Sequence, residues 1–233
     1  MQAYIITIPN NKISIEAANR CINTSVEYKN EFSIKTYDAV TPDTVQQELR
    51  KHKVDWKWPW EGAVTDLQTG LVKQSYPTAV KAKRVSCSLS HLNLWKECIR
   101  VRAPILILEH DAMFLRKLDY NDYIKDDKYS IIGINNPLGN TRRSSVFHQA
   151  IQKSRYPICD VPVIDEVYVP QGLAGNSAYI IKPDAANKLV KAVHKHGLWP
   201  NDAIMCRQLL PYTIGVTKQY YTDTQRIVST TTR

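Results

Sequence analysis

The feature that most constrains the fold of this chain is a long helical pattern that leads directly into an apolar run. Between Lys81 and Arg102, apolar residues recur at helical spacing along two rows, which predicts a helix covered on two sides. Pro104 ends this helix, and the apolar run Ile105–Leu108 then predicts a fully buried strand. A helix followed at once by a buried strand is typical of proteins that pack helices against a sheet.

The same alternation extends along the rest of the sequence. We expect strands at 3–8, 32–37, 129–134, 173–181 and 213–216, and helices at 14–30, 183–196 and 202–210. A further short helix is expected to begin at Thr41-Pro42-Asp43, because proline suits the first turn of a helix. The segments 50–78 and 135–168 follow neither period and are expected to be long loops. The pattern predicts an α/β fold.

The composition is that of a globular protein. The 233 residues, 43% hydrophobic and 23% charged, fit a single domain with its own core. No apolar run reaches the length of a bilayer span, and the first nine residues lack the basic flank and cleavage site of a signal peptide. The five cysteines are odd in number and widely spread, which indicates free thiols rather than a disulfide or metal framework. We therefore expect a cytoplasmic protein.

An acidic pair follows the predicted central strand. In an open α/β sheet, ligands collect beyond the carboxyl ends of strands, and Glu109-His110-Asp111 occupies that place. In an extended segment the side chains of Glu109 and Asp111 point the same way. Carboxylates suit Mg²⁺ or Mn²⁺, which in turn can hold the diphosphate of a nucleotide. Acidic residues also follow strands without any such role, so the pair alone is weak support for a metal site.

The motifs around this pair carry a family resemblance. They are, in chain order, Tyr4–Pro9, Tyr37–Val40, Ser86–Cys98, Pro104–Ala112, Gly175–Pro183 and Pro200–Asp202. Together they resemble glycosyltransferase family 25, whose pattern has a helix with a cysteine-x-leucine-serine-histidine core followed by an apolar strand that ends in acids. That family includes lipopolysaccharide-core transferases and collagen galactosyltransferases. The motifs occur in the family's order over most of the chain, and several ordered motifs are far more specific than one.

The resemblance implies a fold and a reaction. It implies a glycosyltransferase-A type fold, a Rossmann-like mixed sheet flanked by helices, formed by residues 1–233 as one domain. Segments 50–78 and 135–168 would then be insertions on the acceptor side. It also implies a UDP-sugar donor, a divalent metal such as Mn²⁺ or Mg²⁺, and transfer of a hexosyl or pentosyl group to an acceptor hydroxyl with inversion.

The resemblance also suggests roles for individual residues. Glu109 and Asp111 would hold the metal. Inversion needs a base for the acceptor proton, and Asp202 is the first choice, with Asp165 and Glu166 as alternatives. Asp202 could instead be a helix N-terminal residue, a position that aspartate favours. The residues expected on the donor side are Ile8, Pro9, Arg20, Ser90, His91, His110 and Tyr179.

Some of the donor-side residues have equally ordinary structural explanations. His91 on a packed helix is more often a core residue, and a strand tyrosine such as Tyr179 is ordinarily structural. The sequence also departs from the family pattern at His110, where an aspartate is common. After the first strand only Arg20 remains of an arginine-rich run. We therefore expect donor recognition to differ from that of the family.

The net charge of +9 and its distribution point to an anionic acceptor, or simply to a solvated surface. Residues 128–159 contain five Lys or Arg and no acid. The expected acceptor contacts are Arg142, Arg143, Lys153, Arg155 and, from the tryptophan-rich loop, Trp58. A second basic cluster contains Lys81, Lys83 and Arg84.

Two acceptors fit these expectations. One is the phosphorylated core of a lipopolysaccharide at the inner membrane of a bacterium. The other is bacteriophage DNA with a hydroxymethylated base, where phosphate contacts would supply affinity. An alternative from a different class is a nucleic-acid-binding module on the same fold without catalysis. Metal-dependent binding of a UDP-sugar would distinguish the enzyme from such a module.

Overall fold

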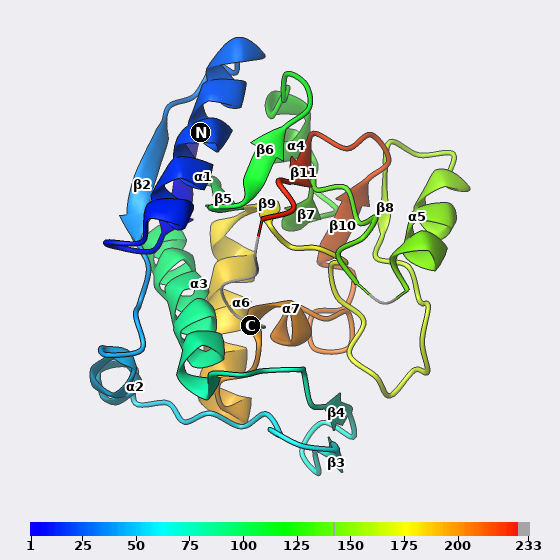
Figure 1. Ribbon diagram of the computed structural model, residues 1–233. Coiled ribbons are helices and arrows are strands. Elements are labelled where there is room, and N and C mark those ends of the chain that lie inside the picture. The colour runs from blue at the N-terminus through cyan, green and yellow to red at the C-terminus, as the bar shows by residue number, and fades with distance from the viewer. Residues whose placement is uncertain (142, 228–233) are drawn as a thin grey trace.

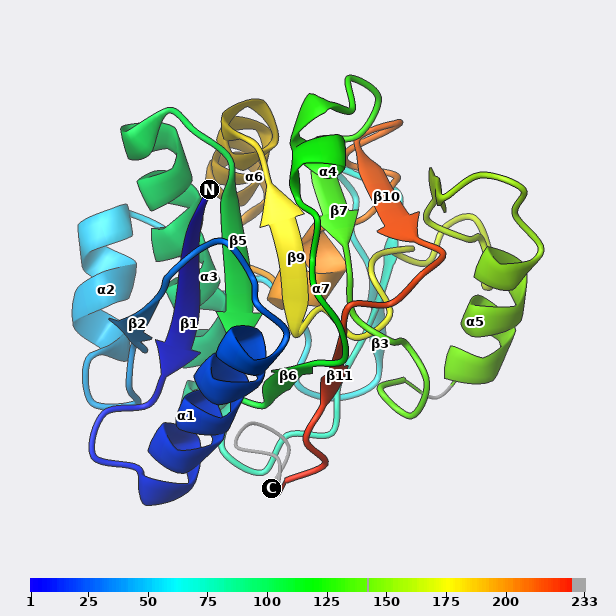
Figure 2. The ribbon, with the colours of Figure 1, turned by 90° about the horizontal axis from the view of Figure 1, so that it is seen from above.

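A seven-stranded mixed sheet forms the centre of the protein, with the strand order β2-β1-β5-β9-β7-β10-β8 (Figures 1 and 2). The computed structural model describes residues 1–141 and 143–227. The strands of this sheet are β1 (Gln2–Thr7), β2 (Ile34–Asp38), β5 (Ile105–Glu109), β7 (Ile131–Gly133), β8 (Ile158–Asp160), β9 (Ala178–Ile181) and β10 (Ile214–Thr217). Strand β1 pairs in parallel with β2 and β5, and β10 with β7, whereas β9 runs antiparallel to both β5 and β7. The sheet confirms the predicted α/β class.

Helices cover both faces of the sheet. They are α1 (Lys12–Glu27), α2 (Val45–His52), α3 (Lys81–Val101), α4 (Asn121–Lys125), α5 (Ser144–Gln152), α6 (Pro183–His196) and α7 (Asn201–Ile204). Because successive strand residues face opposite sides, Ala3 and Ile5 of β1 pack in the core that includes α1, while Tyr4 and Ile6 pack in the core that includes α3 and α6. None of the described helices has the length and apolarity that crossing a bilayer requires.

Helix α3 ends where the sequence predicts. Its two apolar rows are covered by the sheet and by the neighbouring helices α2 and α6. Arg102 then adopts a left-handed conformation with φ of 52°, and the chain turns into strand β5, whose first four residues are fully buried. Trp95 of this helix is 1% exposed, and truncating such a core tryptophan to alanine costs about 3–5 kcal/mol of stability. The helix is therefore a rigid support for the residues on its surface.

The tryptophan-rich segment is more ordered than a plain loop. It contains a hairpin of β3 (Ala63–Thr65) and β4 (Val72–Gln74). Trp58 is buried against Trp199 and Tyr76, with ring centroids 5.5 and 5.6 Å away, and its Nε1 donates to the carbonyl of Gln74 at 3.0 Å. The hairpin is thus anchored to the body by aromatic packing.

Two later segments also differ in detail from the expected elements. The segment 135–168 contains α5 and β8, because residues 144–152 bury Phe147 and Ile151 along one side. The helix expected at 202–210 ends at Ile204, since the chain at Cys206 turns into a bridge with Gly172. Near the end of the described chain, β11 (Thr222–Thr224) pairs antiparallel with β6 (Ala112–Phe114). Figure 2 shows this pair at the edge where β1 and β5 end.

Candidate active site

A cleft of about 700 Å³ opens beyond the carboxyl ends of β1, β2 and β5. Its walls come from the segments that follow these strands, including Ile8, Thr41 and Asp111, and from the facing surface of α3. Asn140 and Arg226 close it from the side of the later chain. We call this cavity the main cleft. It lies where ligands bind in open α/β sheets.

Glu109 is held in the main cleft by a buried chain of hydrogen bonds. Trp95 Nε1 donates to the Tyr179 hydroxyl at 2.9 Å, and the same hydroxyl lies 2.8 Å from His91 Nδ1. Because an ionised Glu109 can only accept, His91 Nε2 is the donor in the 3.2 Å bond to Glu109 Oε1. Burial raises the pKa of Glu109, but the His91 bond and nearby positive charge outweigh it and hold that pKa below its usual value. Glu109 is therefore a fixed carboxylate.

Asp111 is in the opposite situation. Its Oδ1 is buried and has no hydrogen-bond partner among the described residues. Burial and the neighbouring charge of Glu109 raise the pKa of Asp111 to about 7. A buried carboxylate oxygen without a partner is costly, and a divalent cation would relieve that cost. The pair of Glu109 and Asp111 therefore fits the predicted metal.

A second set of candidate ligand atoms fits a metal less well. Donor atoms of Cys87, His91 and Glu109 all lie within 4.8 Å of one another. Both His91 nitrogens are already engaged, however, by Tyr179 and Glu109. Burial, and then the charge of Glu109, raises the pKa of the Cys87 thiol well above its ordinary value, so the thiolate that a metal needs is disfavoured. This set is better explained as the support of Glu109.

Basic side chains line the main cleft beside the acids. Lys83 and Arg84 project from α3, and Arg226 comes from the segment after β11. The sequence predicts Lys83 and Arg84 as part of a basic cluster on the acceptor side. The spacing of residues 84, 87 and 91 is nevertheless helical, and it indicates that Arg84 lies on the same helix face as His91. No sequence pattern indicates that Arg226 lies in the main cleft, because its position depends on the pairing of β11 with β6.

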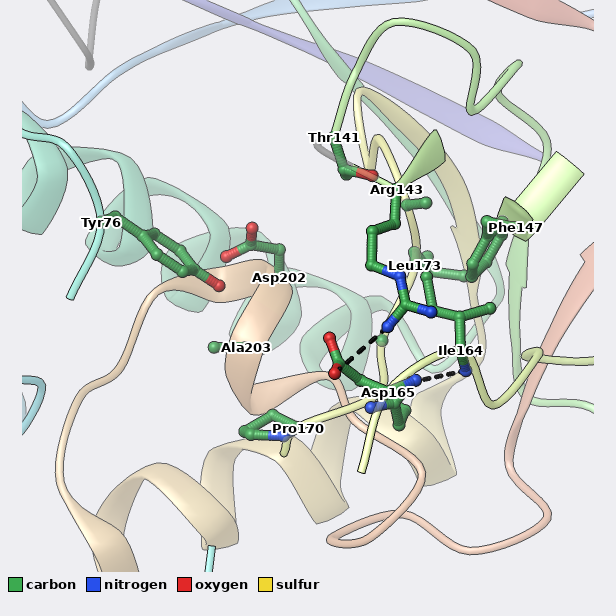
Figure 3. Close-up of a pocket in the computed structure, with 13 residues that line it drawn as sticks. Tyr76, Thr141, Arg143, Phe147, Ile164, Asp165, Pro170, Leu173, Asp202 and Ala203 are labelled. Carbon is green, nitrogen blue, oxygen red and sulfur yellow. Dashed lines mark hydrogen bonds and ion pairs between the residues drawn. The ribbon is translucent and has the colours of Figure 1, made fainter. Parts of the chain in front are cut away.

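A second cavity of about 560 Å³, the side pocket, adjoins the main cleft (Figure 3). Its lining includes Tyr76, Arg143, Phe147 and Asp165, none of which lines the main cleft. Asp202 lines both cavities. A group held in the main cleft and a group held in the side pocket would therefore meet at one carboxylate.

Asp202 is fixed by its surroundings. It lies in the first turn of α7, and a Cβ added to Gly172 would collide with its carbonyl oxygen, so only glycine permits this approach. Burial, and then the charge of Glu109, raises the pKa of Asp202, while Arg84 opposes the shift. Figure 3 shows the Tyr76 hydroxyl turned toward the Asp202 carboxylate. A carboxylate with a raised pKa is suited to accept a proton.

The other two candidate bases are not among the residues that line the main cleft. Asp165 lines the side pocket, but its Oδ1 is 3.3 Å from Arg143 Nη1, and this ion pair is drawn in Figure 3. Glu166 is exposed and lies outside both linings. Of the three, Asp202 is the carboxylate that faces both cavities.

The structure divides the residues predicted for the donor side. Ile8, Ser90, His91 and His110 line the main cleft, and Pro9 follows Ile8. Ser90 also has a structural role, since its hydroxyl accepts from the amide of Val40 at 2.9 Å. Tyr179 is fully buried behind His91, and Arg20 on α1 donates from Nε to Gln225 Oε1 at 2.7 Å.

The basic loop residues do not converge on one cavity. Arg143 lines the side pocket just before the start of α5, whereas Lys153 and Arg155 are exposed beyond the C-terminal end of α5. Arg142 falls outside the described residues. Trp58 is buried and reaches the side pocket only through its contact with Tyr76.

Comparison with known proteins identifies the class. The family model described as glycosyltransferase family 25 (LPS biosynthesis protein) matches residues 8–205. The chain is thus a glycosyltransferase, and the mixed sheet with helices on both faces is its glycosyltransferase-A type fold. It belongs to glycosyltransferase family 25. No curated protein sequence is a significant match to it.

Solved structures of two glycosyltransferases show distant similarity. Mouse xyloside xylosyltransferase 1 in its apo form has 9% identity and a TM-score of 0.44, covering 93% of this chain and 85% of its own. The apo-form glycosyltransferase GlyE of Streptococcus pneumoniae TIGR4 has 10% identity and a TM-score of 0.40. That match covers 91% of this chain and 44% of GlyE.

Proposed function

We propose that this protein transfers a hexosyl or pentosyl group from a UDP-sugar to an acceptor hydroxyl, with inversion at the anomeric carbon. The observation that carries the proposal is the position of Asp202, which lines both the main cleft and the side pocket. A transferase needs two binding sites that meet at the reacting atoms. The main cleft is assigned to the donor and the side pocket to the acceptor.

The main cleft suits a nucleotide diphosphate. Lys83, Arg84 and Arg226 supply positive charge along its walls, and arginine in particular matches phosphate geometry. Glu109 and Asp111 would hold a Mn²⁺ or Mg²⁺ ion, which would give the buried Asp111 oxygen the partner that it lacks among the described residues. When bound, such an ion stabilises the negative charge of the departing diphosphate.

Asp202 would act as the general base. In this mechanism its carboxylate takes the proton of the acceptor hydroxyl as the hydroxyl oxygen attacks the anomeric carbon. The bond from that carbon to the diphosphate breaks on the opposite side, UDP leaves, and the new linkage has inverted configuration. The raised pKa of Asp202 makes it a stronger base than an ordinary carboxylate. Tyr76, turned toward Asp202, would help to orient it.

The acceptor is proposed to be a carbohydrate that carries anionic groups. Tyr76 and Phe147 give the side pocket aromatic surface, and Arg143 gives it one cation. Aromatic rings beside polar groups suit a sugar, and the arginine suits an anionic substituent. The family description, LPS biosynthesis protein, supports a phosphorylated lipopolysaccharide core. That acceptor would be modified in the cytoplasm at the surface of the inner membrane.

The test is release of UDP from a panel of UDP-sugars with Mn²⁺, against lipopolysaccharide cores and hydroxymethylated DNA. The proposal expects metal-dependent release that the lipopolysaccharide core stimulates. Stimulation by the DNA alone would mean that the acceptor is DNA and not lipopolysaccharide, while the proposed donor and metal dependence would stand. The Asp202→Asn variant is the matched control, because it should still bind UDP and Mn²⁺ without transferring sugar. Failure of the wild-type protein to bind or turn over any nucleotide-sugar would contradict the proposal and leave a binding module on this fold.

A further inference from the structure

The segment after β11 runs along the acidic turn of the main cleft. The β11–β6 ladder places Thr224 opposite Ala112, and the next residue, Gln225, extends it by donating its backbone N–H to the carbonyl of Asp111 at 2.7 Å. This brings a segment near the end of the described chain against the residues that follow β5. The backbone of Asp111 is thus paired with Gln225.

The side chain of Gln225 adds three further contacts. Its Nε2 lies 2.8 Å from the carbonyl oxygen of Ala17 in α1, 2.9 Å from that of Ala112 and 3.4 Å from that of His110. The carbonyl of residue 111 therefore accepts from the backbone N–H of Gln225 and that of residue 112 from its Nε2, while the carbonyl oxygen of residue 110 lies 3.4 Å from the same nitrogen. A shift of the turn that carries Asp111 would break several of these bonds together.

Only a glutamine in one orientation satisfies this arrangement. The amide NH₂ has two protons, which match the two shorter contacts to Ala17 and Ala112. The amide oxygen accepts from Arg20 Nε at 2.7 Å. Turning the amide over would place its oxygen against two carbonyl oxygens and its NH₂ against a guanidinium, so the orientation is set by the surroundings. Arg20, one of the residues predicted for the donor side, is the donor that holds the Gln225 amide oxygen.

The segment itself is anchored on its other side. The Thr224 hydroxyl donates to Asn140 Oδ1 at 3.1 Å, and Arg226 Nη2 donates to the carbonyl of Leu138 at 2.6 Å. Asn140 in turn is packed against Gly175, where an added Cβ would approach it within 2.8 Å. The segment 224–226 thus connects α1, the acidic turn and the far wall of the main cleft, with Gln225 making the contacts to the first two.

We propose that Gln225 is a positioning residue, whose amide holds the His110–Ala112 turn so that the Asp111 carboxylate faces the main cleft. Gln225 lies outside the lining of the main cleft and acts through the backbone of this turn. The inference rests on the proposed metal-dependent transfer. Groups that orient metal ligands in this way commonly affect metal affinity or activity by about 10- to 100-fold.

The experiment compares Gln225→Ala and Gln225→Glu with Gln152→Ala. Gln152 is a matched control, because its Nε2 also donates to a backbone carbonyl of the later chain, that of Lys218, at 2.9 Å. Unlike Gln225, Gln152 lies on α5 and makes no hydrogen bond to the acidic turn. Binding of Mn²⁺ alone, and of Mn²⁺ with UDP, is measured by the loss of the free-ion signal in electron paramagnetic resonance. Thermal unfolding and the kinetic constants for Mn²⁺ are measured on the same samples.

We expect both Gln225 variants to bind Mn²⁺ about 10- to 100-fold more weakly than wild type, with KM for Mn²⁺ rising more than kcat falls. Gln225→Glu keeps the acceptor for Arg20 but loses both N–H donors, so it should not rescue binding. Gln152→Ala should lower the unfolding temperature by a similar amount while binding Mn²⁺ as wild type does.

The inference is overturned if the Gln225 variants bind Mn²⁺ as tightly as wild type, or no more weakly than Gln152→Ala. Either result would mean that Gln225 joins two segments of the fold without affecting metal binding. A wild-type protein that transfers sugar but binds no Mn²⁺ would also overturn it, together with the metal assignment. Failure of the proposed transfer is seen separately, since it appears in the wild-type protein and not in the comparison of variants.

Discussion

The main cleft and the side pocket share Asp202 but are built in different ways. The main cleft is formed by residues at the ends of sheet strands and on the buried helix α3, and Glu109 is fixed by a chain of hydrogen bonds that reaches Trp95. The side pocket is formed largely by loops, and its charged residues Arg143 and Asp165 pair on the surface, with side chains 46% and 44% exposed. The comparison indicates a rigid framework around the proposed donor site and a more adaptable one around the proposed acceptor site.

The largest effect is expected from Asp111→Asn. The change removes a proposed metal ligand, so transfer should fall below detection while the fold is retained. In the metal-free protein the pKa of Asp111 is raised from 3.8 to about 7, so stability should fall as pH rises across that interval, because the unfolded chain releases this proton while the folded protein still holds it. Asp111→Asn should flatten this dependence, as measured by thermal unfolding at a series of pH values. Full activity of the variant with Mn²⁺ would rule out the metal assignment.

A slightly smaller loss is expected from Asp202→Asn, which removes the proposed base that lines both cavities. Loss of a general base costs about 10²–10⁴-fold in kcat. Because the pKa of Asp202 is raised, the wild-type rate should decline as pH falls through that raised pKa, and the variant should lose this acidic limb. Asp165→Asn serves as the comparison in a pH–rate profile. If Asp165→Asn abolished the limb and Asp202→Asn kept it, the assignment of the base would be reversed.

Arg84→Gln should produce an intermediate effect confined to the donor. The guanidinium lines the main cleft and is also held at the carbonyl of Pro77 at 3.2 Å. A charge-assisted phosphate contact contributes roughly 1.5–3 kcal/mol, so KM for the UDP-sugar should rise about tenfold or more. Isothermal titration with UDP checks this directly. If acceptor KM changed while UDP binding stayed normal, Arg84 would instead be assigned to acceptor binding.

The smallest effect is expected from Arg143→Glu, at the surface of the side pocket. The new carboxylate would face Asp165 and repel an anionic acceptor, which should raise acceptor KM several-fold, more strongly at low salt. Donor hydrolysis without acceptor should be unchanged. Lys153→Glu, beyond the other end of α5, provides the matched charge reversal. Equal effects of the two variants would mean that long-range charge, not the pocket, governs acceptor binding.

The sequence predicted the parts of the site that depend on local pattern. The helical rows of α3, the apolar run of β5 and the acids after it are contiguous signals, and they place His91 and Glu109 together. Contacts that join distant segments left no such signal. Tyr76 reaches Asp202 from the hairpin region, and Gln225 reaches α1 across 208 residues. The folded role of such residues depends on strand pairing and packing that single-sequence periodicity does not encode.

The pairing of β11 with β6 has a consequence for the synthesis of the protein. Strand β6 and the acids before it leave the ribosome about a hundred residues earlier than β11, so while those residues are synthesised the acidic turn lacks its partner strand. Contacts of such long sequence separation form late and slow folding. A nascent or truncated chain that ends before residue 222 would therefore lack one wall of the main cleft. The proposed nucleotide-sugar donor would then stabilise the folded protein against proteases but give little protection to chains that end before residue 222.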